Sequence, residues 1–148
     1  MRKILVAIDG SDTALQALDY AIRQAGYSPP AELHVLTVRP PTTVYSAGEI
    51  YLTAERLQEA AAERAQQVLA EAGKRLDAAG CKYTIEQLEG DPAETITRRA
   101  VELGCQSITM GTHGHGALGI LLLGSVAQRV LHYTSLPVTV VKQSSVRT

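Results

Sequence analysis

The sequence predicts a single α/β domain built on an open, twisted parallel sheet with helices on both faces. Short apolar segments alternate with amphipathic segments along the 148 residues, so that five expected strands alternate with four expected helices. This alternation favours parallel strands joined by right-handed crossovers. The apolar segments are short and unbroken, as is typical of strands buried on both faces. The length fits one domain, residues 1–148.

The first two strands and the helix between them have clear boundaries. Residues 4–8 (Ile-Leu-Val-Ala-Ile) form the first expected strand, and turn and N-cap residues follow it at 9–12. The next segment has apolar residues at helical spacing up to Gly26, which ends the helix just before Pro29-Pro30. Residues 33–38 form the second expected buried strand.

A long loop and a long helix are expected in the middle of the chain. Residues 39–51 show no clear periodicity, so we expect a loop there, and loops of this length are often functional. Residues 53–79 are rich in Ala, Glu, Gln and Leu and have one apolar face, which predicts a helix. Residues 83–87 form a weaker strand candidate.

The third helix has the strongest start signal in the sequence. Asp91 can act as its N-cap, Pro92 fits the first helical position, and Glu94 completes a capping box. We expect this helix to run to about residue 103, because Gly104 can end it. Three further elements are expected after it: a strand at 107–110, a helix from Gly124-Ser125 to residue 133, and a strand at 137–141.

Composition and charge exclude several classes of function. The net charge is −1 and the six tyrosines are scattered, so neither nucleic acid nor an anionic membrane is an expected partner. No apolar stretch is long enough to span a membrane, and the N-terminus has no apolar region like that of a signal peptide. Cys81 and Cys105 have no metal or redox spacing, and two lone thiols fit a cytoplasmic protein.

Charge is distributed unevenly along the chain. Residues 1–102 hold 11 basic and 15 acidic side chains, whereas residues 103–148 hold three basic side chains and no carboxylate. A segment without carboxylates repels an anion least, so this segment is the better place for an anion site. Chance is the alternative explanation of the asymmetry.

Glycines in that carboxylate-free segment have a spacing suited to phosphate binding. Gly111-Thr112-His113-Gly114 follows the fourth expected strand, and Gly124-Ser125 comes after nine intervening residues at the start of a helix. Glycines let backbone N–H groups approach an anion, and a helix N-terminus adds free donors and a positive dipole. The alternative is a connector that only turns the chain, with Ser125 as an ordinary N-cap.

Other phosphate and metal motifs have less support. Residues 114–119 match G-x-G-x-x-G, but no acidic residue follows Glu102 to bind a ribose, so a dinucleotide-dependent dehydrogenase is not expected. No Walker A motif occurs in the sequence. His113 and His115 have no carboxylate or cysteine nearby in the sequence, so we expect no metal site there.

The whole chain resembles the universal stress protein family, in the branch that binds ATP. The Gly-x2-Gly-x9-Gly-Ser spacing is that of this branch. The resemblance covers residues 3–11, 90–96, 108–114, 121–131 and 136–141. It implies a Rossmann-like, HUP-type sheet with strand order 3-2-1-4-5, and a homodimer formed through Val138 and Val140 of the last strand.

The resemblance also implies a set of nucleotide-binding residues. Ala7 and Asp9 would flank adenine and ribose, although Asp9 can also serve as a turn former or N-cap. Val38 would contact adenine, largely through its backbone. The glycine loop would wrap the ribose and phosphates, and the start of the next helix would bind the phosphate tail. These two segments comprise Met110, Gly111, Thr112, His113, Gly114, His115 and Gly116, and then Gly124, Ser125 and Val126.

The function implied is a nucleotide-dependent regulator in the stress response. ATP is the expected ligand, with Mg²⁺ held mainly by its phosphates, and AMP or another adenine nucleotide is the alternative. ATP would order residues 39–51 and the glycine loop, and a protein partner would recognise that change. A slow ATPase or phosphotransferase, with Asp9, His113 or His115 as its candidate residues, and a nucleotide-free dimeric adaptor are the competing hypotheses. No Lys or Arg lies between Arg99 and Arg129, so weak hydrolysis at most is expected.

Overall fold

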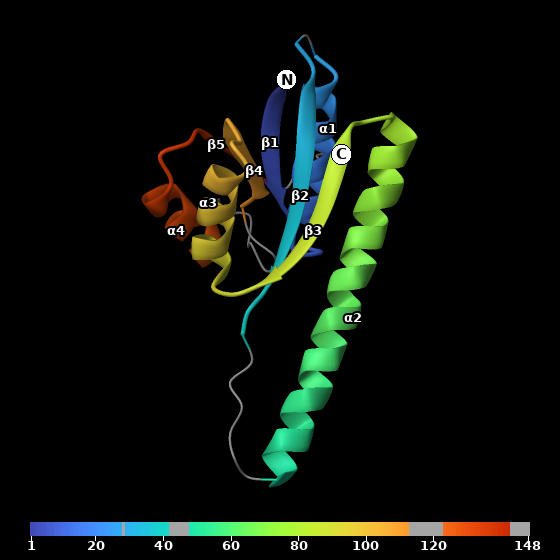
Figure 1. Cartoon of the computed structure of the whole chain (residues 1–148), viewed down its shortest axis with the longest axis vertical. Coiled ribbons are helices and arrows are strands. Elements are labelled where there is room, and N and C mark those ends of the chain that lie inside the picture. The colour runs from blue at the N-terminus through green and yellow to red at the C-terminus, as the bar shows by residue number, and fades with distance from the viewer. Residues whose placement is uncertain (28, 42–47, 113–122, 143–148) are drawn as a thin grey trace, which may run out of the picture.

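The computed structural model describes residues 1–27, 29–41, 48–112 and 123–142. In this part of the chain strands and helices alternate, as the sequence predicts (Figure 1). The elements are β1 (Arg2–Ala7), α1 (Asp12–Ala25), β2 (Ala31–Arg39), α2 (Gly48–Ala79), β3 (Tyr83–Glu89), α3 (Pro92–Glu102), β4 (Ser107–Gly111), α4 (Ser125–Tyr133) and β5 (Val138–Val141). The strand ends lie within two residues of their predicted positions.

The strands form one sheet in the order β3-β2-β1-β4-β5. Each neighbouring pair is parallel, with Ala7 of β1 opposite Leu36 of β2 on one side and Met110 of β4 on the other. The fold class and the strand order are therefore confirmed. Strand order reverses beside β1, because β2 follows it on one side and β4 lies on the other, and such a position is where open α/β sheets bind ligands.

Two apolar cores lie on the two faces of the sheet. Along β1, Ile4 and Val6 pack with α1 and α2, whereas Leu5 and Ala7 pack with α3 and α4. This division follows from the alternation of side chains in a strand. Each fully buried Leu or Val contributes about 1.5–3 kcal/mol by leaving water. Apolar residues on both sides explain why β1 is an unbroken apolar run in the sequence.

The start of α2 differs from the prediction. The helix begins at Gly48, inside the segment that we expected to be a loop up to residue 51. Periodicity detects the packed part of a helix, but a formed helix extends easily because each added residue brings one more hydrogen bond. With 32 residues at ~1.5 Å each, α2 is ~48 Å long. Figure 1 shows its N-terminal part extending past the carboxyl ends of the strands.

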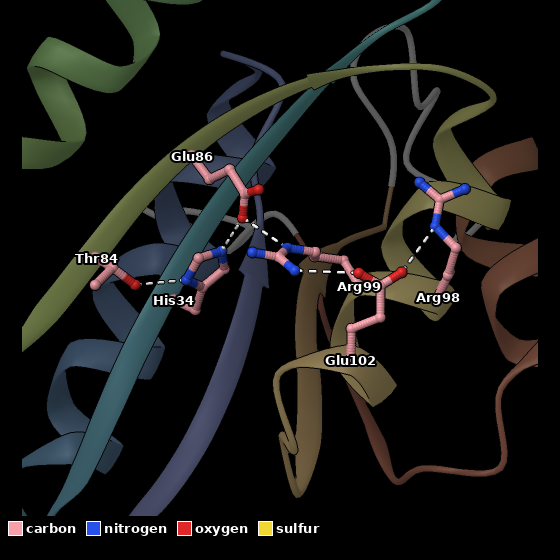
Figure 2. A network of polar contacts seen from close by, with 6 residues as sticks. All are labelled: His34, Thr84, Glu86, Arg98, Arg99 and Glu102. Atoms are coloured by element: carbon pink, nitrogen blue, oxygen red, sulfur yellow. Dashed lines mark hydrogen bonds and ion pairs between the residues drawn. The ribbon is translucent and has the colours of Figure 1, made fainter.

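A polar network joins the edge strand β3 to β2 and α3 (Figure 2). Glu86 of β3 accepts hydrogen bonds from Nε2 of buried His34 at 2.6 Å and from Nε of Arg99 at 2.9 Å. Thr84 contacts the other ring nitrogen of His34, and Arg99 also binds Glu102. Burial favours the neutral Glu86 carboxyl, but the bonds from Arg99 and His34 outweigh this and hold its pKa below the usual range. The network positions β2 and α3, whose ends border the candidate site.

Both cysteines of the chain are explained by packing. Cys81 and Cys105 are free, and burial raises the pKa of both thiols, so they behave as small apolar side chains. For Cys105 the nearby charges of Lys3 and Arg99 oppose that rise without cancelling it.

Among the described residues, no helix combines the length and the apolar character that crossing a membrane would require.

Candidate nucleotide-binding site

A cavity of about 440 Å³ opens at the carboxyl ends of β1, β2 and β4. Its other walls come from the starts of α1, α3 and α4 and from one face of α2. It therefore lies at the reversal of strand order beside β1. Its volume is within the range of small-molecule sites, which run from about 300 to 1,000 Å³.

The cavity brings together predicted residues from distant parts of the chain. Those in the described region lie on its wall: Ala7, Asp9, Val38, Met110, Gly111, Thr112, Gly124, Ser125 and Val126. The remaining four predicted residues are outside the described residues: His113, Gly114, His115 and Gly116. The two glycine motifs are close in space, because the Gly124 N–H donates to the Thr112 carbonyl at 2.7 Å.

The N-terminus of α4 differs from those of α1 and α3. Its N-cap is Gly124, which has extended backbone angles (φ −63°, ψ 161°), and no side chain of the described region caps it. Its first turn also contains no acidic residue. The free N–H groups and the positive end of the helix dipole are thus available for an anion. The alternative interpretation of Ser125 as the N-cap is wrong, because Ser125 is the first helical residue.

Asp9 lines the cavity and also shapes the turn into α1. Its Oδ1 accepts the Ser11 N–H at 2.9 Å. Ser11 in turn caps α1 by accepting the Ala14 N–H at 3.2 Å. Asp9 is exposed, so the turn-forming role does not prevent its carboxylate from also contacting a ligand hydroxyl.

Gly111 has a packing role that the sequence did not reveal. A Cβ at this position would lie 2.6 Å from Thr13 Oγ1, 2.7 Å from Thr13 C and 2.8 Å from Ala14 N. Glycine is therefore required where the end of β4 meets the start of α1. The sequence interpretation assigned Gly111 to phosphate approach or to turning the chain. It missed this contact because Thr13 is about a hundred residues away in the chain.

A bidentate ion pair holds α4 against α3. Arg129 Nη1 and Nη2 donate to the two carboxylate oxygens of Asp91 at 2.9 and 3.0 Å. Asp91 also caps α3 by accepting the Glu94 N–H at 3.0 Å, as the sequence predicts. The bonds from Arg129 and from this N–H lower the pKa of Asp91. The pair orients α4 while leaving its N-terminus free.

Two arginines on the cavity wall were missed by the sequence interpretation. Arg39 is the last residue of β2, and Arg64 lies in α2. Neither arginine is near the glycine motifs in the chain, so the spacing of those motifs gave no indication of either one. The available signal was the position of Arg39 directly after Val38 at the end of a strand.

Protein ligands for a metal ion are few in this region. Within the described ranges, no group of three His, Cys, Asp or Glu side chains is placed to bind a metal. Asp9 is the one carboxylate on the described cavity wall. A Mg²⁺ that entered with a nucleotide would therefore take most of its oxygen ligands from phosphates and water.

The sheet, its crossovers and the cavity beside β1 define an α/β protein of the open, Rossmann-like class. Within that class the chain belongs to the universal stress protein family. The model of the universal stress protein family matches residues 1–142. The resemblance to the universal stress protein family is thereby confirmed.

Individual relatives agree with this assignment. Universal stress protein MJ0531 of Methanocaldococcus jannaschii is 35% identical over 144 residues, which is 96% of this chain and 82% of the relative. The solved structure of MJ0577 from the same organism has a TM-score of 0.80 at 29% identity, covering 97% of each chain. A universal stress protein solved in complex with cAMP has a TM-score of 0.72 at 26% identity, covering 97% of this chain and 98% of the other.

Proposed function

We propose that this protein binds ATP and acts as a nucleotide-dependent regulator in the stress response. The observation that carries the proposal is the start of α4 at Gly124, which no side chain of the described residues caps and which lies in the same cavity as Asp9 and Val38. A helix start of this kind suits phosphate, and the related protein in complex with cAMP is an example of an adenine nucleotide bound in this family.

The cavity offers a complementary group for each part of an adenine nucleotide. Ala7, Val38 and Met110 supply apolar surface for the base. Asp9 supplies a carboxylate that can accept hydrogen bonds from ribose hydroxyls. The N–H groups at the start of α4 face the phosphates, and Mg²⁺ would be held mainly by those phosphates.

Calorimetry on nucleotide-free protein tests the proposal. ATP with Mg²⁺ is titrated into the full chain, with AMP and GTP in parallel. We expect binding in the micromolar range or tighter, with ATP preferred over GTP. A folded, nucleotide-free protein that binds none of the three would overturn the proposal and favour the nucleotide-free adaptor.

A pair of glycine variants separates loss of the site from loss of the fold. Gly124→Val places a branched side chain at the start of α4, so ATP binding is lost while the thermal melt is retained. Gly26→Val is the matched control, because Gly26 ends α1 and is not on the cavity wall, and its added Cβ would make an ordinary contact at 3.6 Å. Unchanged ATP affinity in Gly124→Val would contradict the proposed phosphate position.

We also propose that the protein acts in the cytoplasm and forms a homodimer whose interface is β5. A protein partner then recognises the nucleotide-bound state of this dimer. β5 ends the sheet order and pairs with β4, and its residues Val138 and Val140 are half-buried. An edge strand of this kind usually pairs or is covered. Sedimentation of Val140→Lys should show monomers, whereas Val101→Lys, on the exposed surface of α3, should sediment as wild type.

A further inference from the structure

Arg39 and Arg64 come from the two elements that form one wall of the cavity. Arg39 follows Val35 by four residues in β2, so both lie on the sheet face that Val35 shares with α1 and α2. Arg64 lies three residues after Ala61 and four before Val68, so these three residues share one face of α2, and all of them line the cavity. Both arginines therefore lie on the α2 side of the site.

Arg39 has a hydrogen-bond donor, Nε, without an acceptor in the described part of the chain. Its Nε is buried and has no hydrogen-bond partner among the described residues. Its nearest charge partner is Glu89, at 4.0 Å from Nη2, and the Glu89 side chain is 51% exposed. A contact of this length near solvent contributes little, whereas a buried donor without a partner is costly. The described protein therefore leaves the Arg39 guanidinium without a strong partner.

The charge of the cavity wall has the sign that a phosphate needs. The charged residues on its described part are Asp9, Arg39 and Arg64, so two positive charges face one negative charge. The whole chain, in contrast, has a net charge of −1. No ion pair joins Arg64 to another described residue. Concentrating positive charge in a concave site attracts anionic ligands.

We infer that Arg39 and Arg64 form a second phosphate subsite on the α2 wall of the cavity, in addition to the start of α4, so that the cavity selects adenine nucleotides by the number of their phosphates. Arginine suits this task because its planar guanidinium donates to two phosphate oxygens at once. The subsite supplies the positive side chains that the sequence between Arg99 and Arg129 lacks. This inference rests on the proposed function and makes it more specific: ATP and ADP bind more tightly than AMP, and AMP more tightly than adenosine.

Calorimetry with a graded set of ligands tests the subsite. ATP, ADP, AMP, adenosine and inorganic tripolyphosphate are each titrated into wild type, Arg39→Gln and Arg64→Gln. We expect each variant to bind ATP and tripolyphosphate at least about tenfold more weakly, as loss of a charge-assisted hydrogen bond predicts. Adenosine affinity should stay within about twofold, because adenosine carries no phosphate.

Two further variants sharpen the test. Lys74→Gln removes a positive charge from an exposed position of α2 away from the cavity wall, and ATP affinity should not change. Arg39→Lys keeps the charge but loses the Nε donor and the guanidinium geometry, so its ATP affinity should fall between those of wild type and Arg39→Gln. Melting curves check that each variant is folded. Because Arg64 is exposed, we expect Arg64→Gln to fold even if Arg39→Gln does not.

The outcomes separate this inference from the proposed function. One outcome is that wild type binds ATP and that the arginine variants lose affinity for ATP and for adenosine equally, or for neither. In that case the subsite is wrong and the proposed function stands. If wild type binds tripolyphosphate through the arginines but no adenine nucleotide, the subsite stands and the proposed function is wrong. Binding of neither class of ligand by wild type overturns both.

Discussion

The N-termini of α3 and α4 differ in what can bind their free backbone N–H groups. At α3, the Asp91 carboxylate accepts the Glu94 N–H, so the helix start is satisfied within the protein. At α4, Gly124 has no side chain that could do so. The start of α3 is therefore stabilised by its own side chain, and the start of α4 remains available to an anion. Among α1, α3 and α4, the helix whose start has no side-chain cap within the described residues is the one at the candidate site.

The two helix starts are also mechanically linked. The carboxylate that caps α3 binds Arg129 of α4 through two hydrogen bonds. Arg129 lies one turn beyond the uncapped N-terminus, so the pair holds α4 without covering its free N–H groups. A local contact of the fold thus maintains the geometry of the site.

Converting the start of α4 into one like that of α3 should have the largest effect. In Gly124→Asp, the new carboxylate caps α4 and repels phosphate, and the backbone angles of Gly124 are accessible to aspartate. We expect ATP affinity to fall at least about a hundredfold, or about 2.7 kcal/mol, in calorimetry. The melting temperature should stay the same or rise.

The neutral variant Gly124→Asn is the matched control for that change. Asparagine also caps helices but carries no charge, so its loss of ATP affinity should be smaller. Equal ATP affinity in wild type and Gly124→Asp would show that phosphate does not bind at the start of α4.

Gly111→Ala should come next and should affect stability rather than binding alone. The added Cβ would meet Thr13 and the Ala14 backbone nitrogen at 2.8 Å or less, and backbone at such a distance cannot move aside easily. We expect the free energy of unfolding, measured with urea, to fall by about 1–3 kcal/mol. This result would separate a glycine required by packing from Gly124, whose variants should affect the ligand.

A second glycine provides the control for Gly111→Ala. Gly73 lies within α2, where a Cβ would make ordinary contact with Ile85 at 3.7 Å. Gly73→Ala should therefore stabilise the protein, by about 0.5–1 kcal/mol, because alanine favours the helix. Equal urea midpoints for wild type and Gly111→Ala would argue against the close approach of β4 and α1.

Removing the cap of α3 should have a smaller effect than either glycine change. Asp91→Ala removes both the acceptor for the Glu94 N–H and the partner of Arg129. We expect the melting temperature to fall by a few degrees and ATP affinity to fall by less than about tenfold, because α4 loses its tether but keeps its free N-terminus. A loss of ATP affinity as large as in Gly124→Asp would mean that the two helix starts are not separable.

The smallest expected effect is the pH dependence of that same contact. Arg129, followed by the Glu94 N–H, lowers the folded-state pKa of Asp91 below its ordinary value of 3.8. A lowered pKa stabilises the fold above the unfolded value and ceases to do so as pH falls through the folded one. Urea unfolding should thus show wild type more stable than Asp91→Asn at pH 5 to 7, with the difference shrinking below about pH 4. A difference that grows in acid would contradict the assigned pKa direction.

Much of the architecture depends on local chemistry and could be predicted from the sequence. The unbroken apolar run of β1, the turn and N-cap segment at residues 9–12 and the Asp91 cap depend on residues close together in the chain, so pattern and spacing were sufficient. Which residue of 9–12 caps α1, namely Ser11, came from the structure. The predicted site residues of the described region also lie on one cavity wall, because parallel strands end at the same edge of a sheet. The start of α2 was the exception, since helix extension leaves no periodic signal.

Contacts between distant segments were settled by the tertiary structure. Thr13 beside Gly111, Asp91 beside Arg129, and Arg39 and Arg64 on one cavity wall each join residues that no local pattern connects. Strand order decides which segments meet, and it reflects the packing of two cores on opposite faces of the sheet rather than any short motif. The sequence therefore specified the helix start that can bind an anion, and the fold added the arginines that give the cavity its charge.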